Sequence, residues 1–347
     1  MKIKSIGILI TFIFLSLSGY SQYQGRNYLG AELYSSQLFR FGRFEARMYM
    51  AAQSGTVSSM FLYHNDSYMG APEPWREIDI EVLGKSPSNF QSNMITGVAG
   101  KQVMSEQHHE LGFYANTGYH TYAIEWTQDY IAWFVDDVEV RRATSSQVTD
   151  LRDTDLGLRF NLWVSSVTSW VGPFDPQLLP AHQFINWIKY YAYTPGEGDN
   201  NSDFKLSWQD DFNTFNNSRW RKGNWSFDGN LAYLTPSNIN VKDGVLIISL
   251  TEKDSPGFSG NIPVDNNPGS NIENTYSSTL KVYPNPVKDM LYVQYSTQEN
   301  EQKSIQVYNI FGELVRETKD KKIDFSELPN SIYVVKVKDE WIKVVKR

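Results

Sequence analysis

Three acidic residues alternate with aliphatic residues over one short stretch, and they are the strongest sign of chemistry in this sequence. Because successive side chains of a strand point to opposite faces, Glu77, Asp79 and Glu81 are predicted to share one face of a strand. The aliphatic residues between them would pack into a core. Like charges this close destabilise a sheet, so a chain that keeps them is expected to use them. The alternative interpretation is an amphipathic strand with an acidic, solvated face.

A pair of carboxyl groups on one surface can hydrolyse a glycosidic bond. One carboxylate attacks the anomeric carbon, and the other protonates the leaving oxygen and later activates water. Four strand steps of about 3.3 Å place the Cα atoms of Glu77 and Glu81 roughly 13 Å apart, whereas a retaining pair needs its carboxyl groups about 5–5.5 Å apart. Two glutamates that lean toward each other close most of this gap. The shorter Asp79 suits a supporting role, holding Glu77 and shifting the pKa values of its neighbours.

The stretch Trp75 to Lys85 resembles the Glu-x-Asp-x-Glu signature of glycoside hydrolase family 16. Its uninterrupted spacing is similar to the lichenase branch, the 1,3-1,4-β-glucanases, because laminarinases and agarases usually carry one more residue before the last glutamate. The resemblance implies that Glu77 is the nucleophile, Glu81 the general acid/base and Asp79 the assisting residue.

The composition narrows the classes of partner. The sequence has no cysteine, which excludes a disulfide scaffold, a thiolate metal site and a cysteine nucleophile. Ten Trp and twenty-one Tyr suit a protein that stacks ring-shaped ligands such as sugars, although many will fill a β core. The formal charge of −7 argues against nucleic acid and fits a neutral polysaccharide. We expect a monomer without a membrane span.

The first residues are typical of a secretory signal. Lys2 and Lys4 precede an apolar run at 6–17, and small residues follow it before a polar segment begins. Residues 1–22 are therefore predicted to be a signal peptide, and the protein is expected outside the cell or at its surface.

From residue 23 to residue 258 the pattern indicates many short strands separated by turns and no long helical period. Strands are predicted at 44–50, 55–64, 77–83, 90–97, 120–126, 130–135, 138–142, 157–164, 183–194 and 244–251. This spacing favours an all-β sandwich. The family resemblance specifies a concanavalin A-like jelly roll.

The order of the segments points to a circular permutation. Residues 195–201 have the composition of a linker, and the block that follows, 203–251, resembles the amino-terminal part of ordinary lichenases. Here it lies after the acidic stretch. Joining the usual termini and opening the chain elsewhere is physically cheap when the termini lie close on a compact surface.

The end of the chain has a different composition. Residues 259–278 are predicted to be a flexible linker and residues 279–347 a second, small immunoglobulin-like β-sandwich. This module resembles the C-terminal sorting domain of type IX secretion, with Tyr-Pro-Asn-Pro at 283–286, Tyr-Asn-x-x-Gly at 308–312 and a lysine-rich last strand. Ser331 stands where glycine is usual. The resemblance implies the secretion machinery as a partner; a carbohydrate-binding or spacer module is the alternative.

Further candidate residues come from the family resemblance. Aromatic side chains offer flat faces to pyranose rings, and amides donate to and accept from sugar hydroxyls. The matching positions that would line the sugar subsites are Phe61, Tyr63, Asn65, Gln91, Asn93, Arg159, Asn161, Trp163, Trp225 and Phe227.

No cofactor is expected for catalysis. The resemblance implies a structural Ca²⁺ held mostly by backbone carbonyl groups, which leave almost no trace in a sequence. The matching positions are Asn186, Asp211 and Gly244. The histidine pair His108-His109 has no acid at ligand spacing and is interpreted as an exposed loop.

Together these patterns predict a secreted retaining endo-1,3-1,4-β-glucanase. Laminarinase or xyloglucanase activity within the same family remains open, and so does a non-catalytic, lectin-like sandwich that binds the same glucans. The carboxylate pair separates an enzyme from a lectin-like protein, because a binding protein has no need of both Glu77 and Glu81.

Overall fold

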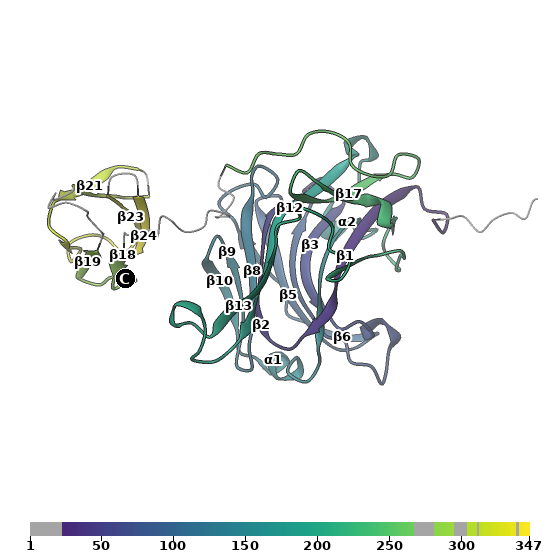
Figure 1. Cartoon of the computed structure of the whole chain (residues 1–347), viewed down its shortest axis with the longest axis horizontal. Helices are drawn as coiled ribbons and strands as arrows, with labels where there is room; N and C mark the ends of the chain where they lie inside the picture. The colour runs from purple at the N-terminus through teal and green to yellow at the C-terminus, as the bar shows by residue number, and fades with distance from the viewer. Residues whose placement is uncertain (1–22, 267–280, 295–303, 311, 338–339) are drawn as a thin grey trace, which may run out of the picture. The chain divides into compact units, whose positions relative to one another are not determined.

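The computed structural model of this chain describes residues 23–266, 281–294, 304–310, 312–337 and 340–347 (Figure 1). The chain divides into two compact units, Met1–Gly269 and Ser270–Arg347. The predicted signal peptide at 1–22 and most of the predicted linker lie outside the described residues.

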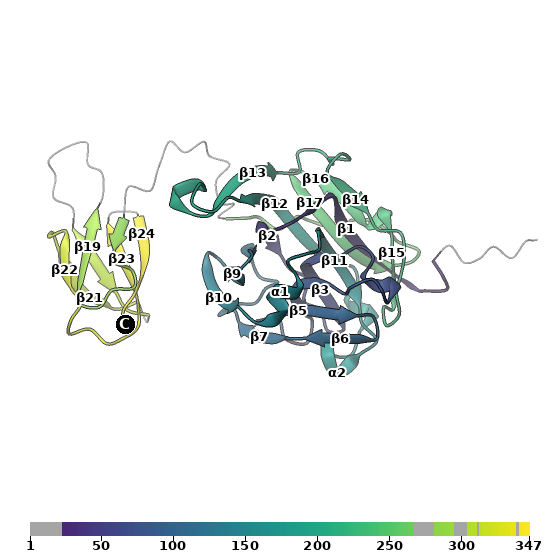
Figure 2. The ribbon, with the colours of Figure 1, turned by 90° about the horizontal axis from the view of Figure 1, so that it is seen from below.

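The first unit contains two sheets, and the one that carries the acidic stretch is called the front sheet here. Its strands hydrogen-bond in the spatial order β14 (Trp220–Lys222), β1 (Tyr28–Phe39), β11 (Leu156–Val164), β3 (Thr56–Tyr63), β4 (Glu77–Leu83) and β5 (Asn89–Val98). The short strands β6 (Lys101–Met104) and β7 (Gln107–Glu110) both pair with β5. Figure 2 shows β1, β11 and β3 side by side.

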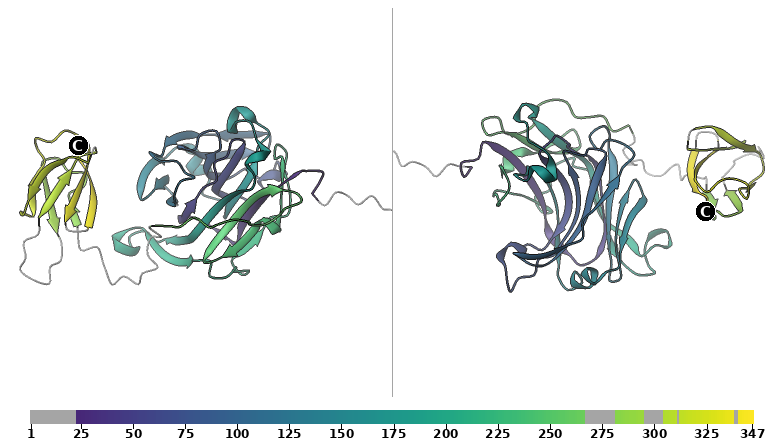
Figure 3. Two further views of the ribbon diagram at one scale, coloured as in Figure 1. Left: turned by 90° about the horizontal axis from the view of Figure 1, so that it is seen from above. Right: turned by 180° about the vertical axis from the view of Figure 1, so that it is seen from behind.

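The back sheet lies against the front sheet (Figure 3). Its order is β10 (Val138–Ala143), β9 (Ile131–Val135), β8 (His120–Trp126), β2 (Gly42–Tyr49) and β12 (Ala181–Tyr193). On the other side of β12 two strands follow one another, β17 (Val245–Glu252) along its first half and β13 (Phe204–Asp210) along its second. β16 (Ile239–Lys242) pairs with β17, and β15 (Ala232–Leu234) pairs in parallel with β1.

Helix is scarce in the described residues of this unit. The elements are α1 (Ser146–Asp150), α2 (Thr168–Val171), η1 (Ser67–Met69), η2 (Pro176–Leu178), η3 (Asp199–Asn201) and η4 (Pro236–Asn238). In the described part of the chain, no helix has the length and apolar character needed to cross a membrane.

The core lies between the two sheets and follows from the alternation of each strand. Ile78, Ile80 and Val82 of β4 are fully buried, and they pack with back-sheet residues such as Phe44 and Trp126. The strand predicted at 77–83 is therefore confirmed, with its aliphatic face inward as expected. The predicted all-β sandwich is confirmed as well.

β1 is the main strand that the sequence pattern did not predict. Its first half pairs with β15 and β17, and its second half pairs with β11 and β14, so the strand connects the two sheets. Leu29, Ala31 and Leu33 are fully buried, and Glu32 between them is buried too. A strand buried on both faces shows no simple alternation of apolar and exposed residues, which is why period-two reasoning missed it.

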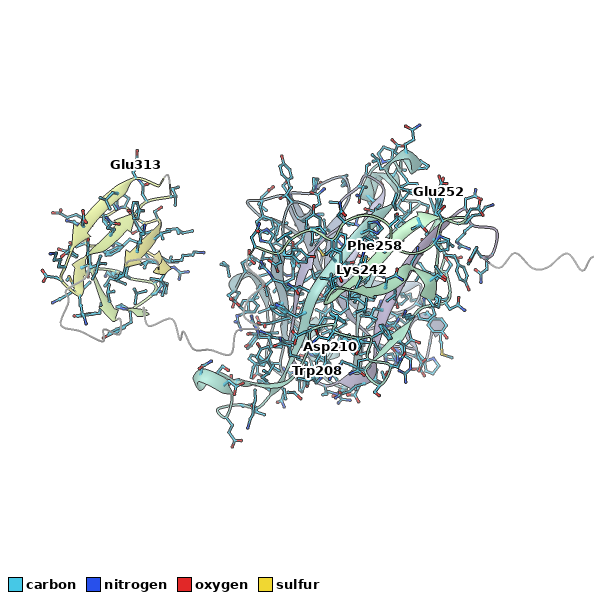
Figure 4. The ribbon with its side chains drawn as sticks, turned by 45° about the horizontal axis from the view of Figure 1, so that its top comes forward. Trp208, Asp210, Lys242, Glu252, Phe258 and Glu313 are labelled. Atoms are coloured by element: carbon cyan, nitrogen blue, oxygen red, sulfur yellow. The ribbon has the colours of Figure 1, made fainter. Side chains whose placement is uncertain are left out.

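The residues after β17 return across the back sheet and are held there. Phe258 and Ile262 pack on a cluster that includes Tyr49 and Phe184, and the Lys242 ammonium lies 5.5 Å from the centre of the Phe258 ring (Figure 4). Asp265 accepts two hydrogen bonds from Arg47, at 3.0 and 2.8 Å. We call residues 253–266 the strap. Its last eight residues belong to the segment predicted as linker.

The second unit has its own core. One sheet has the order β18 (Lys281–Tyr283), β19 (Met290–Gln294), β22 (Lys322–Asp324), and the other has β21 (Leu314–Thr318), β20 (Ile305–Tyr308), β23 (Ile332–Val337), β24 (Glu340–Val345). Buried residues from both sheets, including Leu291, Ile305, Phe325 and Val335, form one cluster. Two sheets around one core is the arrangement expected for a small β-sandwich.

Candidate active site

The three acids of β4 lie on the face of the front sheet that points away from the core. The register of β4 is uninterrupted against β3 and β5, so the acids keep the spacing of a regular strand. Four of the predicted subsite residues stand directly opposite them: Phe61 and Asn93 flank Asp79, Tyr63 flanks Glu77, and Gln91 flanks Glu81.

Glu77 is the better stabilised carboxylate of the two glutamates. The Trp75 indole N–H donates to its Oε2 at 2.8 Å, and its carboxyl group also forms a hydrogen bond with Asp79. Burial raises the pKa of Glu77 to about 7, while these hydrogen bonds and the positive charge of Arg159 act in the opposite direction.

Glu81 has fewer donors and holds its proton more tightly. Burial raises its pKa to about 8, the negative charges of Glu77 and of the exposed Glu106 add to the rise, and a 2.9 Å hydrogen bond from the Gln91 amide opposes it. Near neutral pH the two groups can therefore differ in protonation, and the larger number of donors to Glu77 favours the proton on Glu81. An ionised Glu77 beside a protonated Glu81 matches a nucleophile and a general acid.

Asp79 is buried, with 3% of its surface exposed. Burial raises its pKa well above the usual range, and the nearby charges of Glu77 and Glu81 raise it further. A hydrogen bond between two carboxyl groups needs a proton, and these causes place that proton on Asp79, as a donor to Glu77. In addition, the Trp133 indole of the back sheet donates to the backbone carbonyl oxygen of Asp79 at 2.9 Å, which holds β4 against the back sheet.

Arg159 of β11 organises the neighbouring part of the face. It donates to Asn65 Oδ1 at 2.7 Å and forms a short ion pair with Glu32, and its guanidinium lies 5.0 Å from the centre of the Tyr63 ring. Asn161, two residues further along β11, donates to Glu32 at 3.3 Å. The structure thus brings four predicted residues together around Glu32.

Three of the predicted aromatic residues, Trp163, Trp225 and Phe227, form two groups. Trp163 of β11 contacts Phe227 edge to face at 4.9 Å between ring centres and lies 6.0 Å from Trp170. Trp225 packs at 5.4 Å against Tyr34 of β1. Phe227 is 38% exposed, so its ring is available to a ligand. Asn93, in contrast, accepts a backbone hydrogen bond from Ser105 at 3.0 Å and is buried, so its carbonyl oxygen already serves the fold.

Four residues at this site were missed by sequence reasoning: Glu32, Tyr34, Trp75 and Trp170. The Trp170 indole donates to Gln91 Oε1 at 3.1 Å, and Gln91 in turn donates to Glu81, so Trp170 orients the amide. A single acid within the small and apolar residues at 29–33 was the available signal for Glu32, and Tyr34 follows two positions later. Nothing in the local sequence marks Trp170, which reaches the site from α2.

The three positions predicted for calcium lie together on the back sheet, away from the acids. On β12, Asn186 follows the last residue paired with β17 and precedes the first residue paired with β13. Asp211 directly follows β13, and Gly244 directly precedes β17. A Cβ at Gly244, whose φ is +75°, would come 3.9 Å from the Asp211 carbonyl oxygen. The backbone carbonyl groups here fit the oxygen ligands of Ca²⁺, which would join three strands and supply stability; the site stays a prediction.

Comparison with known proteins shows the family of the first unit. Residues 15–189, half of the chain, match the family described as glycosyl hydrolases family 16. A β-glucanase of Fibrobacter succinogenes is 54% identical over 243 residues, which cover 70% of this chain and 69% of that protein. This chain belongs to glycosyl hydrolases family 16. Its jelly-roll sandwich is the fold of this family.

Other relatives match a smaller part. A β-glucanase of Brevibacillus brevis is 37% identical over 167 residues, which are 48% of this chain and 61% of that protein. The solved structure of a Bacillus licheniformis β-glucanase is 34% identical over 46% of this chain and 70% of that one, with a TM-score of 0.40. The predicted circular permutation stays a prediction. The segment predicted to join the usual termini, 195–201, is the turn of the β12–β13 hairpin, closed by a 2.7 Å hydrogen bond from Thr194 to Asp203.

The second unit also matches a known family. Residues 281–347 match the secretion system C-terminal sorting domain, as the resemblance implied.

Proposed function

We propose that this chain is a secreted retaining endo-1,3-1,4-β-glucanase, which hydrolyses β-1,4 bonds next to β-1,3 bonds in mixed-linkage glucans such as lichenan and cereal β-glucan. The observation that carries the proposal is the pair of buried glutamates on one strand face, where the Trp75 indole donates to Glu77 at 2.8 Å and the Gln91 amide donates to Glu81 at 2.9 Å.

In this proposal each carboxyl group has one task at a time. The Glu77 carboxylate attacks the anomeric carbon while Glu81 passes its proton to the leaving glycosidic oxygen, which leaves a glycosyl ester on Glu77. The ionised Glu81 then takes a proton from water, and the resulting nucleophile releases the sugar and restores the Glu77 carboxylate. The Trp75 N–H and the Asp79 carboxyl group donate to Glu77 and stabilise it as a leaving group.

The substrate would lie across the front sheet between the two aromatic groups. Trp163, Trp225 and Phe227 would stack on pyranose rings, and Asn65, Gln91 and the Arg159 cluster would bond to hydroxyl groups. The uninterrupted Glu-x-Asp-x-Glu spacing supports the 1,3-1,4 specificity over a laminarinase. The name β-glucanase of the Fibrobacter and Brevibacillus relatives supports a β-glucan as substrate.

The sorting domain and the predicted signal peptide support export to the cell surface or the medium. Ending the chain near residue 270 is expected to leave glucanase activity unchanged and to stop export in a host with type IX secretion. A shortened enzyme that is folded but inactive would show that the second unit does more than direct export.

Product analysis tests the specificity. Purified protein is incubated in parallel with barley β-glucan, laminarin, xyloglucan and carboxymethylcellulose, and the products are separated by size. We expect tri- and tetrasaccharides from barley glucan alone. Products from laminarin or xyloglucan would keep the family and overturn the specificity. If no substrate is cut while barley glucan retards the protein in a gel, the chain is a lectin-like binder.

A further inference from the structure

A second cluster of potential ligands lies in the loop that precedes the acidic strand. The loop, residues 64–76, follows β3 and leads into β4. His64 and Asp66 at its beginning and Glu73 near its end each offer one ligand atom, and these three atoms all lie within 4.8 Å of one another.

The spacing within the cluster suits one metal ion. His64 Nε2 lies 3.4 Å from Glu73 Oε2. Two ligand atoms on a tetrahedral ion, each about 2.1 Å from it, are separated by roughly 3.4 Å. Among the described residues, Glu73 is paired with His64 of the cluster itself, and no lysine or arginine forms an ion pair with Asp66 or Glu73.

The loop is held in this shape by its own hydrogen bonds. The Ser67 hydroxyl, which is fully buried, donates to the Pro74 carbonyl at 3.1 Å and accepts from the Arg76 N–H at 3.1 Å. The His64 N–H donates to the Arg76 carbonyl at 2.9 Å, which extends the β3–β4 ladder by one step. The two ends of the loop are therefore already close, and an ion would find its ligands nearly in place.

We propose that His64, Asp66 and Glu73 bind one divalent transition-metal ion, with Zn²⁺ as the best match. One imidazole nitrogen with two carboxylate oxygens is a ligand set that Zn²⁺ accepts, and it leaves a fourth position for water. Ca²⁺ and Mg²⁺ prefer ligand sets made of oxygen alone. This site is separate from the carbonyl positions predicted for calcium on the back sheet.

The position of the loop gives the ion an effect on the front sheet. The loop carries Asn65, which accepts from Arg159, and Trp75, which donates to Glu77. An ion that joins both ends of the loop would restrict the motion of these two residues and so change the turnover of substrate. That effect rests on the proposed function, whereas the binding of the ion does not.

Metal titration of the full chain tests the site. Protein without an affinity tag is stripped with a chelator, returned to buffer with excess Ca²⁺, and titrated with Zn²⁺ by calorimetry and with Co²⁺ by visible absorption. We expect one Zn²⁺ per chain and the intense Co²⁺ bands of a tetrahedral site. His64→Gln and Glu73→Gln should each weaken binding by at least about tenfold, since even the loss of an outer-shell partner costs 10–100-fold.

A matched control removes a different histidine–carboxylate pair. His120 Nδ1 lies 2.6 Å from Asp136 Oδ2 on the back sheet, so His120→Gln should retain Zn²⁺ binding. Circular dichroism of the metal-free variants checks that each is folded. The proposal is overturned if wild-type protein binds no Zn²⁺ at millimolar concentration, or if His64→Gln and Glu73→Gln bind it as the wild type does. Zn²⁺ binding without glucan hydrolysis would support this site and reject the proposed function.

Discussion

The buried carboxyl groups of the back sheet and the three acids of β4 on the front sheet differ in whether a cation is paired with them. On the back sheet, Arg43 lies 2.6 Å from Glu45 and 2.9 Å from Glu125. Arg47 is paired with Asp265 of the strap at 2.8 Å. On the front sheet, among the described residues, no lysine or arginine forms an ion pair with any of the three acids of β4.

This difference in pairing affects the pKa values of the buried groups. Burial tends to lower the pKa of Arg43, but Glu45 and Glu125 outweigh it, so the guanidinium holds its proton more tightly than usual. Burial raises the pKa values of Glu77 and Glu81. The charge of Arg159 opposes the rise at Glu77, but Arg159 is itself paired with Glu32. Removing one partner of a buried ion pair is costly, whereas buried acids without a cation can exchange protons.

The largest effect is expected at the unpaired acids. Glu77→Gln and Glu81→Gln should each reduce turnover of barley β-glucan by at least about 10²–10⁴-fold, because each removes a group that transfers a proton or forms the covalent bond. Circular dichroism should show the wild-type fold. If either variant retains near-wild-type turnover, the assignment of that residue is wrong.

A paired acid should show the opposite behaviour. Asp265→Asn removes the closer of the two carboxylates that pair with buried Arg47, leaving Asp136 at 3.7 Å, and we expect it to cost about 1.5–3 kcal/mol of unfolding free energy. Turnover at a temperature below the melting transition should stay unchanged. The control is Asp155→Asn, which removes an exposed ion pair with Arg40 and should cost less than about 1 kcal/mol. Equal losses in urea unfolding would mean that the strap is not anchored at Asp265.

The unpaired acids should lower stability as the pH rises. A folded carboxyl group with a raised pKa binds its proton more tightly than the unfolded chain does, so its contribution is complete below about pH 4.3 and is lost as the pH passes the folded values of about 7 and 8. Glu77→Gln and Glu81→Gln should therefore melt above the wild type at about pH 8.5 and close to it at about pH 5. Melting temperatures that differ equally at both pH values would contradict the raised pKa values.

The smallest effect should come from removing calcium. A chelator is expected to lower the melting temperature and to leave turnover unchanged well below it, because Asn186, Asp211 and Gly244 lie on the back sheet. Differential scanning calorimetry with and without Ca²⁺ measures the shift, with Mg²⁺ as the control ion. An unchanged melting temperature would remove the calcium prediction.

The sequence by itself determined the chemistry of β4 and most of the strands around it. Alternation predicted that Glu77, Asp79 and Glu81 share a face, because period two is a local property of any strand. The strands at 77–83 and 120–126 have the predicted bounds, since their turns and alternating residues lie next to each other in the chain.

Only the tertiary structure decided which partners each acid meets. Glu32 and Trp170 are far from residue 77 in the chain and reach the site through β1 and α2, whose sequences lack a clear period. Asp265 lies in a segment with the composition of a linker, and pairing with Arg47 holds it in place. The pKa difference between Glu77 and Glu81 also arises here, because burial and hydrogen bonds depend on strands that are distant in sequence but adjacent in space.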